Sequence, residues 1–302
     1  MEIEGPIIVT GSSGFVGRAL AARLGASFEA LHFAAGDWRR RVESIDFRSA
    51  TIFHLAARVH RRGERDDDAA YRADNVEKTR VLAETAARQG ARRLVFLSSV
   101  KVNGEETRER PFRRDDPPRP GDAYARSKRD AERALAEVAE RAPLERVVVR
   151  SPLVYGPGAG GNLRALMRLA DTPWPLPFGA IENRRSFVHV DDLARLLVAC
   201  GAHARPAPLY LAANMASVPS TGRIVSLMRA ALGRPARLVR IPTEVLETMG
   251  SLGGQGARVK RLTRSLDVDA SDAQRELGWN AAVDIEESIE QMAAAYGLEK
   301  AR

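Results

Sequence analysis

Residues 8 to 17 read Ile-Val-Thr-Gly-Ser-Ser-Gly-Phe-Val-Gly, so an apolar strand runs into a glycine-rich turn that opens a helix. Gly11 permits a tight turn, Gly14 lets backbone amides approach a ligand, and Gly17 lets the helix pack closely on the strand. The N-terminus of such a helix offers free N–H groups and a partial positive charge to an anion. The pattern therefore predicts a site for a dinucleotide pyrophosphate. Its Gly-x-x-Gly-x-x-Gly spacing differs from the generic Gly-x-Gly-x-x-Gly fingerprint, and a purely structural turn is the alternative.

The composition is that of a globular chain with a sizeable core. Its 302 residues suffice for one large domain and a smaller lobe. The formal net charge is +8, and 42 of the 47 basic residues are arginine because only 5 are lysine. Acidic residues are interleaved with the arginines, as in Arg108–Asp116. We therefore interpret the basic excess as solvated surface rather than as a nucleic-acid-binding face.

Several classes of protein are disfavoured. Cys200 is the single cysteine, so we expect neither a disulfide framework nor a thiolate metal cluster. No apolar run approaches the roughly 18 residues that a membrane span needs, and we find no signal segment before the first strand. We expect a soluble, cytoplasmic protein that binds neither nucleic acid nor a membrane.

Strand and helix patterns alternate up to Arg150, which predicts an α/β fold of the Rossmann type with a doubly wound parallel sheet. The short interval before Thr51 suggests that one βα unit is shortened or lost. We expect residues 1–155 to bind the dinucleotide and residues 156–302 to form mainly a smaller C-terminal lobe for a second ligand, with some return of the chain to the sheet. The expected strands are Ile7–Thr10, Phe28–Phe33, Thr51–Ala56, Arg93–Ser98 and Arg146–Arg150, and the expected helices are Gly14–Leu24, Ala69–Gln89 and Tyr124–Arg141, with further helical stretches near 192–200 and 222–232.

A second constellation is Tyr124-Ala-Arg-Ser-Lys128. Positions i and i+4 share a helix face, so we expect the Lys128 ammonium beside the Tyr124 phenol. A tyrosine with a pKa near 10 is a poor base at neutral pH, and a nearby cation favours its ionised form. Ser99, at the end of the preceding strand, offers a hydroxyl to the same substrate oxygen, whereas Ser98 is interpreted as structural. The pattern predicts proton transfer, and a surface pair on a helix is the alternative.

These motifs occur with others in an order that resembles a known family. The others are His54-Leu-Ala-Ala57, Asn75, Phe96-Leu-Ser-Ser99, Tyr155-Gly-Pro-Gly158 and Arg185-Ser-Phe-Val-His-Val-Asp-Asp192. Together they span nearly the whole chain and resemble the extended short-chain dehydrogenase/reductases, and within them the NAD-dependent epimerase/dehydratase family. Residues 98–104 and 153–158 resemble the branch that contains UDP-glucose 4-epimerase-like proteins and UDP-N-acetylquinovosamine dehydrogenases.

The resemblance implies a role for individual residues. Tyr124 is the general acid/base, Lys128 lowers its pKa and holds the nicotinamide ribose, and Ser99 orients the reacting oxygen. The cofactor, NAD or NADP with NAD slightly favoured, is expected at Gly11, Ser13, Gly14, Phe15, Val16, Gly17, Asp37, Leu55, Ala56, Ala57, Asn75, Tyr124, Lys128, Pro152 and Val154. The substrate, a UDP-sugar, is expected at Arg58, Ser99, Asn162, Arg185 and Arg261, where Arg258 or Arg264 could replace Arg261. The resemblance also suggests a homodimer through the helices expected at 69–89 and 124–141, and it implies no metal.

Departures from the family pattern bear on the chemistry. Sugar-nucleotide dehydratases carry an Asp-Glu pair after the catalytic hydroxyl, where this chain has Val100 and Lys101, so elimination of water is disfavoured. The usual tyrosine beyond that pair is Asn103, which leaves open what this position presents to the substrate. The second strand ends without the acidic residue that grips the adenine ribose of NAD. Asp37 could take its place, or the arginine pair at 39–40 could hold a 2′-phosphate.

Other polar residues have structural explanations. His54 and His189 lie among apolar neighbours, so we expect them to be packed or bonded to the backbone. The pair Asp191-Asp192 suggests metal ligands, but an aspartate before a helical stretch is usually an N-cap, and we expect the cap.

Two enzyme functions and one non-enzyme function follow. The first is a UDP-hexose or UDP-N-acetylhexosamine 4-epimerase, in which hydride leaves sugar C4 and returns to the other face. The second is a 4-reductase of a UDP-4-keto-6-deoxy-N-acetylhexosamine, of the quinovosamine type, which consumes NAD(P)H. The third is a catalytically silent dinucleotide-sensing or assembly protein, and the joint retention of Ser99, Tyr124 and Lys128 argues against it.

Overall fold

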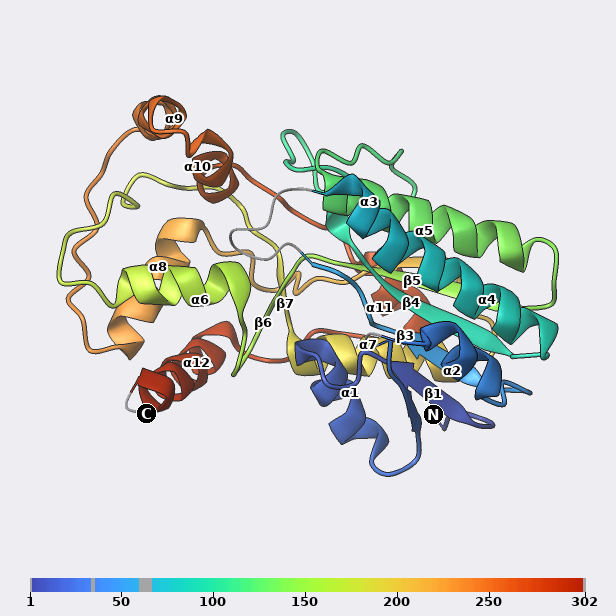
Figure 1. Cartoon of the computed structure of the whole chain (residues 1–302). Helices are drawn as coiled ribbons and strands as arrows, with labels where there is room; N and C mark the ends of the chain where they lie inside the picture. Colours follow the sequence, from blue (N-terminus) through green and yellow to red (C-terminus); the bar gives the residue numbers. More distant parts are fainter. Residues whose placement is uncertain (1, 34–35, 60–66, 301–302) are drawn as a thin grey trace.

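Six parallel strands form one sheet in the order β2-β1-β3-β4-β5-β8, as a computed structural model shows for residues 2–33, 36–59 and 67–300 (Figure 1). The strands are β1 (Ile7–Thr10), β2 (Glu29–Leu31), β3 (Thr51–His54), β4 (Arg93–Ser99), β5 (Glu145–Ser151) and β8 (Leu209–Leu211). β3 is buried along its whole length, as expected for a parallel strand covered on both faces. The strand order reverses between β1 and β3, and ligands bind at the carboxyl ends of strands beside such a switch point.

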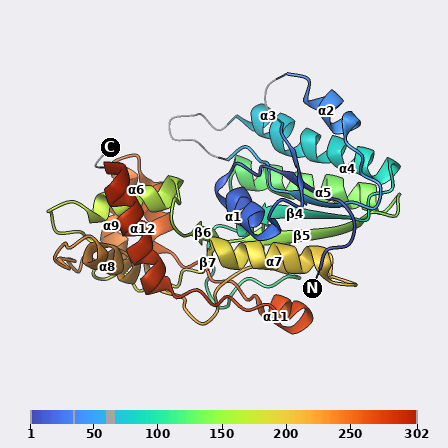
Figure 2. The same ribbon diagram turned by 90° about the horizontal axis from the view of Figure 1, so that it is seen from below.

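Helices cover both faces of this sheet, which is the middle of three layers (Figure 2). One face carries α2 (Trp38–Ser44), α3 (Asp68–Tyr71), the π-helical turn η1 (Arg72–Glu77), α4 (Lys78–Arg88) and α5 (Ala123–Ala139). The other carries α1 (Phe15–Leu24), α7 (Val190–Ala202) and α11 (Ser271–Leu277). A 3-10 turn, η2 (Val100–Val102), follows β4. α4 packs on α5, and α1 packs on α7.

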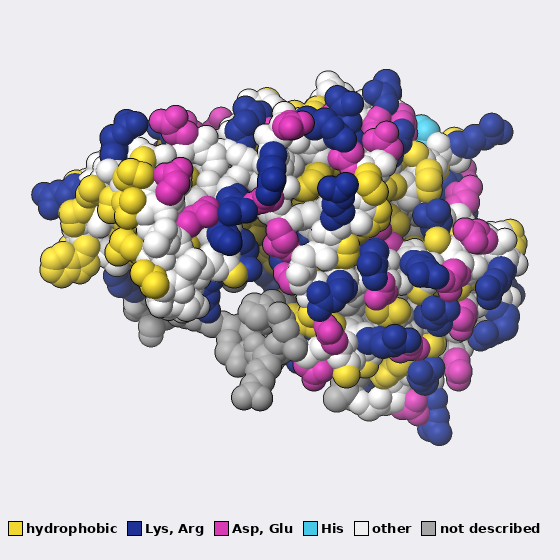
Figure 3. All heavy atoms as spheres, turned by 90° about the horizontal axis from the view of Figure 1, so that it is seen from above, with side chains coloured by type: hydrophobic (Ala, Val, Ile, Leu, Met, Phe, Trp, Pro, Cys, Tyr) yellow, Lys and Arg dark blue, Asp and Glu magenta, His cyan; other side chains and the backbone are white. Residues whose placement is uncertain are grey.

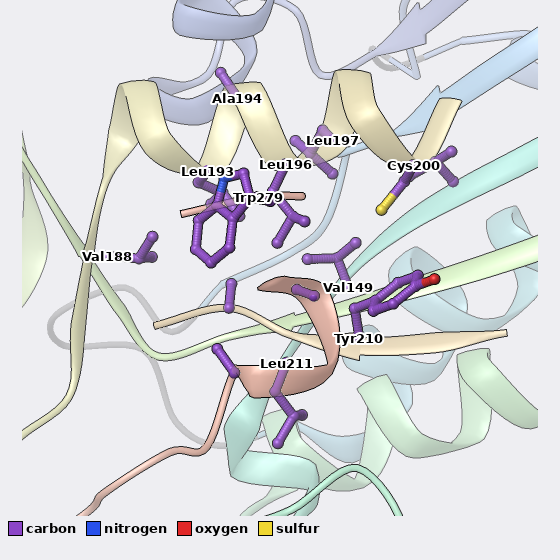
Figure 4. Close-up of a cluster of buried hydrophobic side chains, with 14 of the residues drawn as sticks. Val149, Val188, Leu193, Ala194, Leu196, Leu197, Cys200, Tyr210, Leu211 and Trp279 are labelled. Atoms are coloured by element: carbon purple, nitrogen blue, oxygen red, sulfur yellow. The ribbon is translucent and has the colours of Figure 1, made fainter. Parts of the chain in front are cut away.

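The hydrophobic core under α7 packs the C-terminal half of the chain against the sheet (Figure 4). Leu193 and Leu197 of α7 share one buried cluster with Tyr210 of β8 and with Trp279, which follows α11. The Trp279 indole Nε1 donates to the Asp192 carbonyl at 2.9 Å, so its polar atom is satisfied inside the core. The sheet is therefore completed by residues from beyond position 155.

The second lobe holds a short parallel pair, β6 (Leu153–Tyr155) with β7 (Phe187–His189), and a group of helices (Figure 1). These helices are α6 (Gly161–Ala170), α8 (Thr221–Ala231), α9 (Thr243–Leu252), α10 (Gly256–Thr263) and α12 (Ile285–Lys300). A buried cluster that includes Met167, Met228 and Ile289 joins α6, α8 and α12. α9 and α10 pack on each other at the edge of the lobe.

Residues 264–269 run between the two lobes and bond to both. On one side the amides of Thr107 and Phe112 donate to carbonyls of this segment at 2.8 and 2.9 Å. On the other side the Leu266 amide donates to the Arg184 carbonyl at 2.8 Å. The segment therefore joins the loop after β4 to the strand that leads into β7.

The second βα unit is shortened but present, so its loss, one of the two alternatives from the sequence, is wrong. β2 ends at Leu31 rather than at the predicted Phe33, and the seven-residue α2 follows; residues 34 and 35 lie outside the described part. The helix predicted over 69–89 exists, with the π-helical turn inside it. β8 was not predicted, because its three residues are too few to show a periodic pattern.

The surface carries charges of both signs. On the face in Figure 3, Lys and Arg side chains are interspersed with Asp and Glu. Many charged side chains of the described residues form ion pairs, and Arg110, for example, pairs with Asp116 at 2.6 Å. In the described part of the chain, no helix combines the length and the apolar character that a membrane span needs.

Candidate active site

The glycine turn between β1 and α1 has the conformation that its sequence predicts. Gly11 has φ +73°, and a Cβ there would lie 2.7 Å from the Ala56 backbone nitrogen. A Cβ at Gly17 would lie 2.0 Å from the Gly11 carbonyl oxygen. Both positions therefore require glycine, one for the turn and one for the close packing of α1.

The N-terminus of α1 is open to an anion. Gly14 is the N-cap residue and carries no side chain, and the first turn, Phe15–Arg18, contains no acidic residue. Ser13 and Gly14 are exposed, and Arg18 Nη1 donates to the Ser13 carbonyl at 2.7 Å, which holds a guanidinium beside the turn. Free N–H groups, the helix dipole and a nearby arginine all favour phosphate. These residues fit the pyrophosphate of a dinucleotide.

The loop after β3 is tied to the end of β1. Thr10 Oγ1 accepts the amides of Leu55 and Ala56, each at 3.2 Å, and lies 2.7 Å from His54 Nδ1. These bonds hold the half-buried Leu55, Ala56 and Ala57 beside Gly11. The predicted cofactor residues of the two loops are thus brought together.

His54 is a buried structural residue, as predicted, although its partners are hydroxyl groups rather than the backbone. Its Nε2 lies 2.9 Å from Thr79 Oγ1, which donates its own proton to the Asn75 carbonyl at 2.6 Å. His54 therefore carries its proton on Nε2 and accepts at Nδ1. Burial, and secondarily the charge of Lys128, lowers the pKa of His54 to about 3, so the ring is neutral.

Asn75 clamps the same loop to α5. Its Oδ1 accepts the Arg58 amide at 2.7 Å, and its Nδ2 donates to the Arg58 carbonyl at 3.1 Å and to Ser127 Oγ at 2.9 Å. The Arg58 guanidinium pairs with Asp74 at 3.2 Å. Asn75 thus connects the loop after β3 to the helix that carries Tyr124 and Lys128, and its contact with a cofactor stays a prediction.

Tyr124 and Ser99 meet at the carboxyl end of β4. Ser99 is the last residue of β4, and Tyr124 lies in the first turn of α5, whose N-cap Asp122 accepts the Ala125 amide at 2.7 Å. Burial raises the pKa of the Tyr124 phenol to about 12, the charges of Asp122 and Tyr71 add to the rise, and a hydrogen bond with Ser99 opposes it. The phenol is thus a proton donor at neutral pH in this arrangement.

The predicted effect of Lys128 on the pKa of Tyr124 stays a prediction. The Lys128 Nζ lies over the Phe96 ring, 4.0 Å from its centroid. Burial lowers the pKa of Lys128 to about 7, while the Glu132 carboxylate opposes this change. The i, i+4 spacing places both residues on one face of α5, and the Lys128 Nζ packs on Phe96 of β4.

β5 and β6 bring two further predicted residues to the same end of the sheet. Pro152 is buried between the two strands, and Val154 is half-buried within β6. Val154 pairs with Val188 of β7. Both predicted cofactor contacts therefore lie where the chain passes from the sheet to the second lobe.

Arg185 and Arg261 lie near each other and near the N-terminus of α5. Burial lowers the pKa of Arg185; the Glu105 carboxylate opposes this change, and the charge of Arg261 adds to it. Arg261 also acts on Asp122, the N-cap of α5. Two cations from the second lobe therefore lie close enough to interact with each other and with the helix that carries Tyr124.

The neighbouring arginines have other partners. Arg264 pairs with Glu106 and Glu247, and Arg258 Nη1 donates to Gln255 at 2.7 Å. The contact of Arg261 with the substrate stays a prediction, and both alternatives are engaged elsewhere in the protein. The predicted substrate residue Asn162 is exposed in the first turn of α6.

Comparison with known proteins identifies the family. A model of the NAD dependent epimerase/dehydratase family matches residues 7–212. The chain belongs to this family. It is 33% identical to a UDP-glucose 4-epimerase of Vibrio cholerae, and the match covers 96% of this chain and 95% of that relative. It is 31% identical to a dTDP-4-dehydrorhamnose reductase of Streptomyces griseus, and this match covers 76% of this chain and 82% of the relative. The structure of MoeE5 in complex with UDP-glucose and NAD covers 99% of this chain and 100% of its own, with a TM-score of 0.75 and 25% identity. The family and the α/β fold predicted from the motifs are confirmed.

Lys101 and Asn103, two positions that depart from the epimerase/dehydratase pattern, make specific contacts near the site. Lys101 forms ion pairs with Asp122 and, at 3.2 Å, with Glu105, so a cation joins the N-cap of α5 to the loop after β4. Asn103 is buried, accepts from Arg150 Nη1 at 3.0 Å and donates to the Arg113 carbonyl at 3.2 Å. Asn103 therefore supports the fold behind the site.

The Asp37 carboxylate bonds to a neighbouring residue of α2. It is the N-cap of α2, accepting the Arg40 amide at 3.3 Å, and its carboxylate pairs with Arg40 Nε at 2.7 Å. Arg39 stacks on Trp38, with its Cζ 4.7 Å from the ring centroid. The predicted contact of Asp37 with the cofactor ribose stays a prediction.

The predicted capping by Asp191-Asp192 is wrong. The N-cap of α7 is His189, whose Nδ1 accepts the Asp191 amide at 3.2 Å. Asp192 is fully buried, pairs with Arg195, and accepts the amides of residues 282 and 283 at 3.1 Å. In the ranges that the structure describes, no group of three or more His, Cys, Asp or Glu is placed to hold a metal ion.

Proposed function

We propose that the chain is an NAD(P)-dependent epimerase that inverts C4 of a UDP-hexose or a UDP-N-acetylhexosamine. The observation that carries the proposal is the placement of Ser99, the last residue of β4, next to Tyr124, in the first turn of α5. Both lie at the sheet edge that also carries the open N-terminus of α1. The similarity to the UDP-glucose 4-epimerase of Vibrio cholerae, along nearly the full length of both chains, supports it.

The cofactor would be held by the glycine turn, by the loop Leu55–Ala57 and by Pro152 and Val154. When bound, its nicotinamide ring supplies a hydride acceptor and donor. Lys128, buried on the Phe96 ring, would hold the nicotinamide ribose.

Tyr124 and Ser99 would act on the C4 oxygen of the sugar. Ser99 would bind and orient this oxygen. The ionised form of Tyr124 would take the proton of the C4 hydroxyl and later return it, and a cation bound beside the phenol favours that ionised form. Arg185 and Arg261 would bind the diphosphate of the substrate, because guanidinium groups match phosphate oxygens with paired hydrogen bonds. Lys101 stands where dehydratases need a carboxylate base, so elimination of water is not part of this proposal.

A 4-ketoreductase of a UDP-4-keto-6-deoxy-N-acetylhexosamine is the second candidate, and the neighbourhood of Asp37 favours it. The Asp37 carboxylate is engaged by Arg40, and two adjacent arginines suit the 2′-phosphate of NADPH. The Streptomyces griseus relative is named as a reductase.

One assay separates the candidates. The pure protein is incubated with UDP-glucose or UDP-GlcNAc without added cofactor, and the configuration at C4 is followed by NMR. Appearance of the C4 epimer supports the epimerase. Inertness towards both sugars, relieved only by a 4-keto sugar with NAD(P)H, supports the reductase, and inertness in every assay overturns both.

A further inference from the structure

A buried polar network lies directly behind the catalytic residues. Glu132 of α5 accepts a hydrogen bond from Ser98 Oγ at the end of β4. Arg150, at the end of β5, donates to the same carboxylate through Nε at 3.0 Å and Nη2 at 2.6 Å. The third donor of Arg150, Nη1, reaches Asn103 at 3.0 Å. One carboxylate thus joins two strand ends to the catalytic helix.

Each member of the network stands beside a residue of the proposed site. Ser98 precedes Ser99, Arg150 lies two residues before Pro152, and Glu132 follows Lys128 by one helical turn. Ser98 and Arg150 are also register partners in the β4–β5 ladder. The network therefore fixes how α5 sits on the strand ends that carry the reacting groups.

Stability alone does not explain this network. The side chains of Arg150 and Glu132 are only 6% and 12% exposed, and a buried ion pair of this kind often contributes no more stability than an apolar pair of the same size. The same two strands carry a second pair at their other end, Arg93 with Glu145, far from the site. That pair, in which Arg93 is fully buried and the Glu145 side chain is 50% exposed, provides a control on the same two strands.

We propose that Glu132 is a positioning residue: it holds Ser99 and Lys128 in place through Ser98 and Arg150, and it keeps a negative charge one turn from the Lys128 ammonium. The inference rests on the proposed function, in which Ser99 and Lys128 act on substrate and cofactor.

Among the residues that the structure describes, few charged groups face Lys128. From β3 the neutral His54 interacts with it, from β4 the uncharged Phe96 ring lies under its Nζ, and from α5 itself the Glu132 carboxylate opposes the effect of burial. Loss of the Glu132 charge is therefore expected to favour the neutral amine of Lys128.

The test follows the titration of Lys128 directly, without substrate. The chain has only 5 lysines, so the 13Cε signals of protein labelled with 13C-lysine are few, and Lys128→Arg assigns the signal. We expect Glu132→Gln to lower the titration midpoint of Lys128 by about one pH unit or more. Glu132→Asp, which keeps the charge, is expected to restore most of the midpoint, and Glu145→Gln to leave it unchanged.

A second variant separates the loss of the Glu132 charge from an effect of misfolding. Glu132→Gln leaves Arg150 charged and short of partners, so the double variant Glu132→Gln/Arg150→Met, which buries no unpaired charge, is titrated as well. The double variant is also expected to lower the midpoint. An unchanged midpoint in the folded single or double variant overturns the inference.

Activity is the second measurement. We expect Glu132→Gln to reduce kcat/KM about ten- to a hundredfold, while Glu145→Gln stays near wild type. Equal losses in both variants would show that the network serves only the fold and would overturn the inference. If the wild type turns over no UDP-sugar, the proposed function fails, whereas the lysine titration still decides whether Glu132 acts on Lys128.

Discussion

Gly17 lies against the carbonyl oxygen of Gly11, so closely that a Cβ at Gly17 would come within 2.0 Å of it. This contact seats the N-terminus of α1 on the end of β1. We expect Gly17→Ala to lower the free energy of unfolding by about 3 kcal/mol or more, because the clash is with backbone. The measurement is urea unfolding.

Gly297 provides the control for that substitution. It is exposed in α12, with no atom within 4 Å of an added Cβ, and Gly297→Ala is expected to gain about 0.5–1 kcal/mol through reduced backbone entropy. A Gly17→Ala protein as stable as the wild type would contradict the packing described for the turn.

Removal of the Tyr124 hydroxyl is expected to stop proton transfer. Tyr124→Phe should lower kcat by about 10²- to 10⁴-fold, the range typical of a lost general acid/base, with little change in the affinity for UDP-sugar. Tyr296→Phe removes a hydroxyl that donates to Asp171 in the second lobe and should leave kcat near that of the wild type. Unchanged turnover in Tyr124→Phe would remove the catalytic assignment.

His54 makes the fold sensitive to acid. Its pKa is lowered to about 3 in the folded protein but is near 6.5 when unfolded, so the unfolded chain binds more protons between these values and stability is lost as the pH falls through this window. We expect the melting temperature of His54→Gln to fall less steeply from pH 6.5 to pH 4 than that of the wild type. His32→Gln, on the surface, should follow the wild type, and parallel curves for all three proteins would refute the role of His54.

Arg185 and Arg261 are expected to supply affinity for a diphosphate. Arg185→Ala or Arg261→Ala should weaken UDP binding about 10- to 100-fold, as expected for the loss of charge-assisted hydrogen bonds. Arg258→Ala is the control, since Arg258 bonds to Gln255. Calorimetric titration with UDP measures the effect. If all three variants bind UDP as tightly as the wild type does, the diphosphate is not bound by Arg185 and Arg261.

Much of the site could be predicted because its residues follow strands that end at one edge of a parallel sheet. Gly11 follows β1, Ala56 follows β3 and Ser99 ends β4, so strand order alone brings them together. The glycine spacing and the Tyr-x-x-x-Lys pattern are local in the sequence, so they can be recognised without knowing how the chain packs.

Features that depend on distant pairing could not be predicted. The bond between Glu132 and Arg150 requires the β4–β5 register, and Asp192 finds amides about 90 residues later in the chain. The position of Lys128 over Phe96 depends on a side-chain rotamer, which helix periodicity leaves open.

The segment 264–269 has a consequence for protein engineering. Because it bonds to Thr107 and Phe112 on one side and to Arg184 on the other, a grafted C-terminal half must still match a loop that belongs to the N-terminal half. Chimaeras that exchange substrate preference between relatives should therefore carry residues 104–113 with the transplanted half. Recombination at position 155 alone would mismatch partners across the join.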